Sequence, residues 1–135
     1  MAAIGYYIKR NLPLLRRIDE DERLQEWCRL YADPYGNAAD EFDIAKQLED
    51  FFHGAYECGL VPQNYRETYD EIRIEDLFSR RPTSGELARL STEQLVSVVA
   101  MQFRHDHFSE GVLFGRYVAD GIMLPFLEEL GRRIA

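Results

Sequence analysis

One stretch of the chain, from Gln94 to Gly121, constrains the fold more than any other. Its first third is apolar on almost every side of a helix, through Leu95, Val96, Val98, Val99, Ala100, Met101 and Phe103. A helix that is apolar all round is normally buried inside a protein. The sequence therefore predicts a buried central helix over residues 92–104, around which the rest of the chain packs.

The other segments also show helical periodicity. Apolar residues recur at helical spacing in residues 3–18, in the segment that follows residues 19–22, in residues 38–58 and in the last dozen residues. We find no convincing strand pattern. We therefore expect an all-α fold, with about five to seven helices in a single domain that spans residues 1–135.

Local signals predict where helices begin and end. Pro13 has no amide hydrogen, so we expect the first helix to split or kink just before it. Carboxylates favour the positive end of a helix, so Asp19–Glu22 predict a helix start. Gly59 and Gly121 are typical of the residue that ends a helix. Residues 62–79 suggest two short helices, the second of them around Leu77, followed by a loop.

Hydropathy and cysteine usage indicate a cytoplasmic protein. Hydrophobic residues make up 46% of the chain, but no apolar run is long enough to cross a bilayer. The N-terminus lacks the features of a secretory signal. Cys28 and Cys58 match no zinc or redox motif, so we interpret them as small hydrophobic residues, with a disulfide between them as the alternative.

Charge is distributed unevenly along this acidic chain, whose net charge is −8. Residues 1–17 carry four basic and no acidic residues, whereas residues 18–79 carry seventeen acidic and five basic ones. Sequence-independent binding to nucleic acid needs a basic surface, so we expect no direct nucleic-acid contact. An acidic middle segment favours a partner with a basic surface, although acids also simply keep a protein soluble.

A polar cluster follows the predicted central helix, and its members are Arg104, His105, Asp106, His107 and Glu110. An H-x-H pair shares a face on a strand but not on a helix, and only the distant His53 could add a third imidazole, so we predict no metal site. A histidine beside a carboxylate suits acid–base chemistry, but no nucleophile is evident. The structural interpretation is that Phe108 fills a bend after residue 104 and that nearby polar residues cap the next helix.

This cluster resembles a known signature. Arg104-x-Asp106-His107-Phe108-x-Glu110-Gly111 is similar to the Arg-x-Asp/Glu-Arg-Phe-x-Glu/Asp-Gly motif of a bacterial domain family of unknown function. Residues 56–61, Tyr-Glu-Cys-Gly-Leu-Val, resemble an upstream motif of the same family. The resemblance implies a helical C-terminal region and no particular activity.

Our first functional hypothesis is a non-enzymatic, acidic helical protein-binding module without cofactor or metal. Its partner would be a protein with a basic surface, or a nucleic-acid-binding protein whose site it occludes; no membrane partner is expected. Inhibitor and immunity-type proteins of bacterial or phage origin, such as anti-CRISPR and antirestriction proteins, are the class analogy. The candidate contact residues are Asp19, Glu20, Asp21, Glu22, Asp43, Glu49, Asp50 and Glu57.

Two alternatives remain open. The first is a hydrolase or nuclease whose catalytic residues are Arg104, His105, Asp106, His107 and Glu110. The second is a structural homo-oligomer, held together by surfaces rich in aromatic residues.

Overall fold

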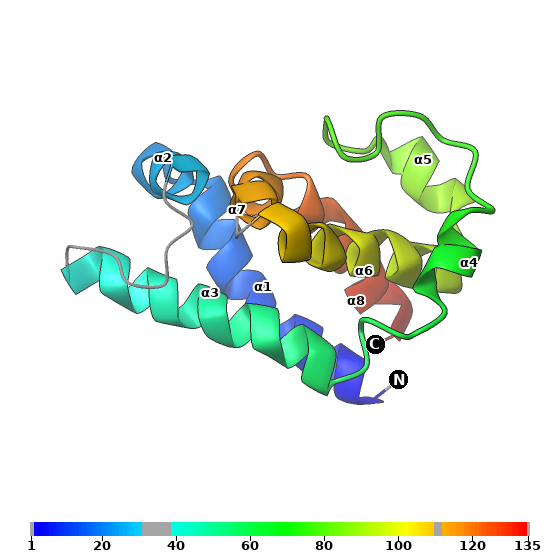
Figure 1. Ribbon diagram of the computed structural model, residues 1–135, viewed down its shortest axis with the longest axis horizontal. Helices are drawn as coiled ribbons and strands as arrows, with labels where there is room; N and C mark the ends of the chain where they lie inside the picture. The colour runs from blue at the N-terminus through cyan, green and yellow to red at the C-terminus, as the bar shows by residue number, and fades with distance from the viewer. Residues whose placement is uncertain (1, 31–38, 110–111, 135) are drawn as a thin grey trace.

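A computed structural model describes residues 2–30, 39–109 and 112–134 of the chain. This part of the chain is built from eight helices without a strand, which confirms the predicted all-α class but exceeds the five to seven helices expected (Figure 1). The helices are α1 (Ala2–Asp19), α2 (Glu22–Leu30), α3 (Ala39–Glu57), α4 (Tyr65–Tyr69), α5 (Ser84–Arg89), α6 (Thr92–Ser109), α7 (Val112–Ala119) and α8 (Met123–Ile134).

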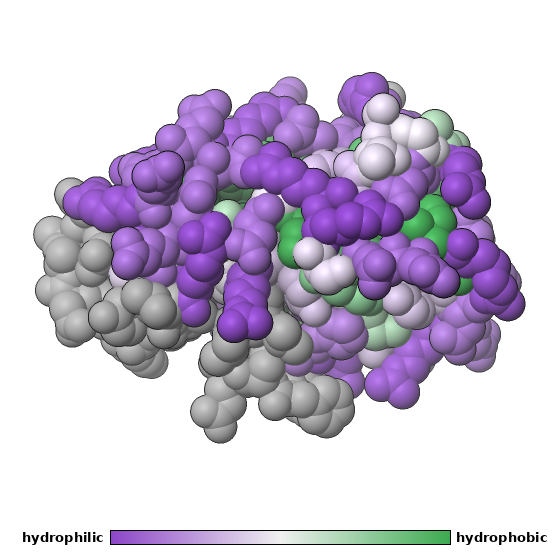
Figure 2. All heavy atoms as spheres, turned by 90° about the horizontal axis from the view of Figure 1, so that it is seen from above, coloured by the Kyte–Doolittle hydropathy of each residue, from purple (hydrophilic) through white to green (hydrophobic). Residues whose placement is uncertain are grey.

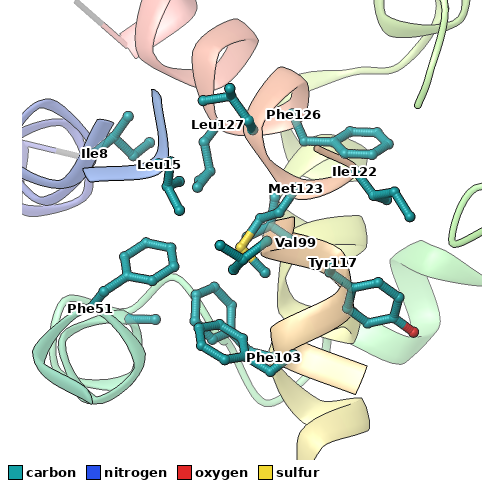
Figure 3. Close-up of a cluster of buried hydrophobic side chains, with 14 of the residues drawn as sticks. Ile8, Leu15, Phe51, Val99, Phe103, Tyr117, Ile122, Met123, Phe126 and Leu127 are labelled. Carbon is teal, nitrogen blue, oxygen red and sulfur yellow. The ribbon is translucent and has the colours of Figure 1, made fainter. Parts of the chain in front are cut away.

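The helix α6 lies at the centre of the fold. It packs against α4, α7 and α8, and its residues 95–100 are all buried. Val99 and Phe103 of this helix point into a cluster that also holds Met123 and Phe126 of α8 (Figure 3). The predicted buried helix is therefore confirmed, but it is longer than expected. It continues past Arg104 to Ser109, since no glycine or proline interrupts this stretch.

The helix α1 differs from expectation, because Pro13 lies inside it and does not split it. Proline leaves the carbonyl group four residues earlier, here that of Lys9, without its helical hydrogen bond. Both Pro13 and Lys9 are exposed, so water can bind this carbonyl group. Buried residues lie on both sides of the proline, among them Ile8 and Leu15, and their packing holds one continuous helix together.

Both predicted glycine stops are confirmed. Gly59 and Gly121 have φ angles of 88° and 69°, a left-handed conformation that glycine adopts easily. The amide of the next residue then bonds back to the last turn, Leu60 to Ala55 and Ile122 to the carbonyl oxygen of Tyr117, each over 3.0 Å. This is the Schellman pattern, and it ends α3 and α7.

The expected helix start before α2 is present as well, and side chains also cap the start of α6. The Asp21 side chain accepts hydrogen bonds from the amides of Arg23 and Leu24, over 3.0 and 3.3 Å. Ser91 and Gln94 form a reciprocal capping box at the start of α6, over 2.9 and 3.1 Å.

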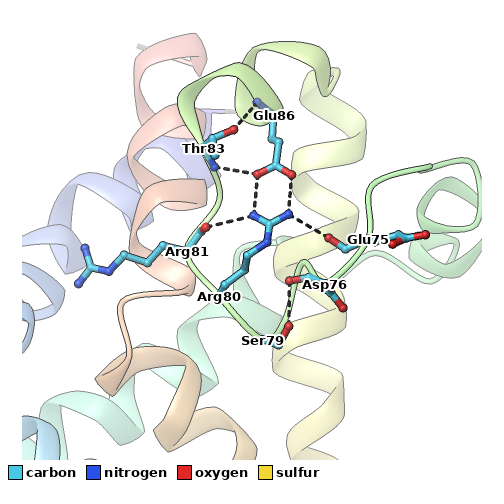
Figure 4. A network of polar contacts seen from close by, with 7 residues as sticks. All are labelled: Glu75, Asp76, Ser79, Arg80, Arg81, Thr83 and Glu86. Carbon is cyan, nitrogen blue, oxygen red and sulfur yellow. Dashed lines mark hydrogen bonds and ion pairs between the residues drawn. The ribbon is translucent and has the colours of Figure 1, made fainter.

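The chain between α4 and α5 does not form the expected second short helix. Asp76 has a φ angle of 61°, which interrupts any helix there. The segment is instead held by Arg80, which binds both carboxylate oxygens of Glu86 over 2.6 and 2.7 Å and the carbonyl oxygen of Glu75 over 3.1 Å (Figure 4). Glu86 also closes a capping box with Thr83, and this starts α5, a helix that the sequence analysis did not anticipate.

The helices α1 and α3 approach each other closely at Tyr7 and Gly54. A Cβ atom on Gly54 would lie 2.9 Å from the Tyr7 ring, so only glycine fits there without a shift. The Tyr7 hydroxyl donates a hydrogen bond to the carbonyl oxygen of Phe51, and the two rings stack with centroids 5.7 Å apart. These contacts fix the position of one helix along the other.

Candidate functional site

Three of the predicted acidic contact residues lie exposed on α3. They are Glu49, Asp50 and Glu57. Asp50 and Glu57 are seven residues apart, which places both on one face of the helix, two turns from each other. Glu49 lies 3.9 Å from Nε2 of His53 one turn further on, whereas no ion pair of Asp50 or Glu57 is present among the described residues.

A groove of about 670 Å³ runs between this edge of α3 and the neighbouring α1. Asp50, His53 and Glu57 line it from α3, and Tyr6 and Arg10 from α1. The Tyr6 side chain is 71% exposed, unlike the neighbouring Tyr7, which is buried. A large exposed aromatic residue at the edge of a groove is a typical anchor for a partner protein.

Tyr6 and Arg10 were not among the candidate site residues predicted from the sequence. A signal was present, because these residues lie four apart and off the buried stripe that holds Ile4, Tyr7 and Ile8. They share the outer face of α1 with Pro13, which also lines the groove. Only the tertiary structure shows that this face borders the acidic edge of α3.

Five of the predicted contact residues do not line this groove: Asp19, Glu20, Asp21, Glu22 and Glu49. Asp19 binds Arg81, and Asp21 caps α2, so both already have structural roles. Asp19 lies at the end of α1 opposite to Ala3, which lines the groove, and an 18-residue helix is about 27 Å long. Glu20 and Glu22 are exposed near Asp19. The side chain of Asp43 lies outside the described residues.

The face seen in Figure 2 offers little to a partner. Hydrophilic side chains cover most of its coloured surface, and hydrophobic residues show only in small areas between them. This view is from above the orientation of Figure 1, where α3 lies at the bottom of the molecule. Of this face and the groove beside α3, the groove is therefore the stronger candidate.

In the polar stretch that begins at Arg104, the described side chains already have hydrogen-bond partners within the protein. Arg104 hydrogen bonds to Tyr65 and Tyr56, whereas Nδ1 of His105 lies 2.8 Å from the Tyr117 hydroxyl. Neighbouring residues on a helix point about 100° apart, and these two side chains accordingly reach different partners. The side chains of Asp106 and His107, the suggested plug at residue 108, and Glu110 lie outside the described residues.

Burial and nearby charges shift the pKa of the described residues around Arg104. Burial lowers the pKa of His105 below its ordinary value, and the charge of Arg66 lowers it further. The His105 ring also packs edge-on against Phe78, with centroids 4.9 Å apart. Burial alone would raise the pKa of Tyr65, but hydrogen bonds from Arg66 and Arg104 outweigh it and lower the pKa. These contacts suit a neutral, packed histidine.

The possible metal ligands and the two cysteines of the described part of the chain lie apart from one another. It holds no group of three or more histidine, cysteine, aspartate or glutamate side chains that could bind a metal ion. Cys28 and Cys58 are both free thiols. Burial raises the pKa of Cys28 to about 12 and also raises that of Cys58, which keeps both thiols protonated and weakly nucleophilic.

Comparisons of this chain with family models, with curated proteins and with solved structures found no match. The resemblance to the bacterial domain family of unknown function, carried by residues 104–111, therefore stays a prediction. Across the described helices, none has the length and apolar character that a membrane span requires.

Proposed function

We propose that this protein is a non-enzymatic binding module that holds a basic segment of another protein in the groove between α1 and α3. The observation that carries the proposal is the combination of a 71% exposed Tyr6 with Asp50 and Glu57 on one groove. Neither carboxylate is in an ion pair with another described residue, so both are available to a partner.

The chemistry of the groove favours a lysine- or arginine-bearing segment. Two carboxylates two helical turns apart can each pair with a basic side chain of the partner. The face of the Tyr6 ring can take a third, because cations bind aromatic faces. Arg10 lies on the opposite side of the groove and would exclude segments that carry positive charge along their whole width.

The class of function that fits this chemistry is inhibition by occlusion. Exposed carboxylates along a helix imitate the charge of a phosphate backbone and steer association with proteins that bind nucleic acid. An inhibitor or immunity-type protein, such as an anti-CRISPR or antirestriction protein, would act in this way. The class rests on analogy, whereas the groove residues rest on the structure.

A pull-down from the native host with quantitative mass spectrometry tests the proposal. The bait is the wild type, the double variant Asp50→Lys/Glu57→Lys, or the control Glu67→Lys/Glu71→Lys. The control acids are exposed, lie outside the groove and give the same change in net charge. We expect a protein with a basic surface to be retained by the wild type and the control and lost from the groove variant.

The purified partner then allows a quantitative measurement. We expect the groove variant to bind it at least about tenfold more weakly, and the difference to shrink as salt screens the charges. Tyr6→Ala should weaken binding with less dependence on salt than the groove variant, because it removes an aromatic ring and no formal charge. Equal binding of the wild type and the groove variant would overturn the proposal, and an enzymatic activity that disappears in His105→Ala would favour the hydrolase alternative.

A further inference from the structure

The groove between α1 and α3 carries opposite charges on its two sides. Arg10 projects from α1 and Asp50 from α3, and both line the groove. They lie at a similar level, because α1 and α3 run in opposite directions (Figure 1). Tyr7 packs against Gly54, and from this contact Arg10 is one turn further along α1 while Asp50 is one turn back along α3. Nevertheless, no ion pair joins these two charged groups.

This arrangement is complementary to itself. A twofold axis parallel to the groove would place α1 of each copy over α3 of the other. Arg10 of one copy would then face Asp50 of the other, and the same pair would form a second time across the axis. A twofold axis across the groove would instead place α1 against α1, with Arg10 facing Arg10. The charges therefore select one of the two ways in which the faces can meet.

We infer that a second copy of this chain docks in the groove, with α1 of each copy lying on α3 of the other. A uniformly basic segment would be repelled by Arg10 and a uniformly acidic one by Asp50, whereas a second copy satisfies both. The exposed Tyr6 of each copy would be covered in the same step. The apolar area and the paired charges then act together, as in other protein interfaces.

Self-association would also regulate the groove. The same carboxylates face the second copy and the proposed basic partner, so the two compete, and a partner must displace the second copy before it binds. The inference goes beyond the proposed function and does not depend on it, because self-association is measured on the protein alone. Failure of the pull-down would leave the dimer measurement unaffected, and the reverse also holds.

Analytical ultracentrifugation of the purified chain tests the inference. At about 0.1 M salt the Debye length is about 10 Å, which screens the repulsion between two acidic molecules but preserves contacts between paired charges. We expect a wild-type dimer at high micromolar concentration. Arg10→Glu and Asp50→Arg should each shift the protein to a monomer, since each variant places like charges opposite each other twice.

Mixing the two variants gives the decisive measurement. One molecule with Arg10→Glu and one with Asp50→Arg present two attractive pairs to each other, so we expect a heterodimer from two monomeric proteins. If the variants were monomeric only because their net charge had changed, mixing them would not restore a dimer. The control is Arg17→Glu, which has the same change in charge as Arg10→Glu on an exposed residue that does not line the groove, and it should remain a dimer.

Two results would overturn the inference. One is a wild-type monomer throughout the accessible concentration range. The other is a mixture of the two variants that stays monomeric although circular dichroism shows both to be folded. Because both substituted residues are exposed, we expect neither variant to unfold.

Discussion

Among the described side chains of α6, two polar ones are buried, and only one of these has a hydrogen bond to another described residue. The Ser97 hydroxyl donates to the carbonyl oxygen of Gln94 over 2.7 Å. The Gln102 side chain is fully buried, and neither its Nε2 nor its Oε1 has a partner there. A buried amide without a hydrogen bond lowers stability by about 1–3 kcal/mol.

Replacing Gln102 should therefore stabilise the protein. We expect Gln102→Leu, which has a similar volume and no polar atoms, to raise the free energy of unfolding by about 1 kcal/mol or more. Chemical denaturation followed by circular dichroism measures this. The control is Ser97→Ala, which removes a hydrogen-bonded hydroxyl and should give no such gain. A lower free energy of unfolding for Gln102→Leu would contradict the assignment and show that the amide has a partner in solution.

His105 should make the stability of the protein depend on pH. Its pKa is lowered in the folded state, first by burial and then by Arg66, so the unfolded chain binds a proton more readily below about pH 6.5. Stability should accordingly fall as the pH drops from the ordinary pKa of histidine toward the lower folded value.

Denaturation of a histidine variant between about pH 7.5 and 5.5 checks this dependence. We expect His105→Gln to flatten the profile, while His53→Gln, which changes an exposed histidine, should leave it steep. His105→Gln also removes the hydrogen bond between His105 and Tyr117. A loss of about 1 kcal/mol in the free energy of unfolding at neutral pH is therefore compatible with the assignment. An unchanged slope would show that His105 is not the titrating group.

At the scale of elements, an ion pair joins the loop before α5 to the end of α1. Arg81 points away from the network around Arg80 and reaches Asp19 at the end of α1 (Figure 4). On its way it passes over Gly121, where an added Cβ atom would lie only 2.1 Å from the guanidinium group. Gly121 therefore has two roles, the left-handed turn and the space for Arg81.

The two glycine stops should differ in their response to substitution. A Cβ atom on Gly59 would meet nothing within 4 Å. Gly59→Ala should therefore lower the free energy of unfolding by only about 1 kcal/mol, the cost of an alanine in the left-handed conformation. Gly121→Ala should cost measurably more, because it also displaces Arg81 from Asp19. Thermal or chemical denaturation gives both values.

A double variant separates the two effects. In an Arg81→Ala background, the cost of Gly121→Ala should fall to that of Gly59→Ala. If the cost of Gly121→Ala stays the same with and without Arg81, the close approach of these two residues contributes nothing.

For the molecule as a whole, aromatic packing holds α3 in place. Phe51 and Phe52 of α3 contact Phe103 of α6 and Phe114 of α7, with ring centroids 5.2–5.9 Å apart. Figure 3 shows Phe51 and Phe103 pointing into the shared core. The acidic edge of α3 is thus presented on a firmly packed helix, which reduces the entropy lost when a partner binds.

The whole molecule also brings charges together that are far apart in the chain. The charged residues among the first seventeen are all basic, and Asp50 of α3 follows some thirty positions later. Close packing of α1 on α3 at Gly54 places the two kinds of charge on opposite sides of one groove. Both proposals, a basic partner segment and a second copy of the chain, depend on this arrangement.

The sequence by itself determined the features that depend on neighbouring residues. Helical periodicity predicted the all-α class and the buried central helix, because residues three or four positions apart lie on the same side of a helix. The stops at Gly59 and Gly121, and the capping residues before α2 and α6, were also predictable, because these motifs span only a few residues. Helical periodicity also placed Glu49, Asp50 and Glu57 on the exposed side of α3.

Only the tertiary structure decided the features that depend on contacts between distant segments. Pro13 stays inside α1 because packing on both sides of it outweighs one lost hydrogen bond. The segment before Arg80 is irregular because that arginine binds Glu86. The groove pairs Tyr6 and Arg10 with Asp50, about forty residues away, and no local pattern encodes that distance. Local rules specify which face of a helix is apolar, but the packing of the whole chain decides which exposed residues meet.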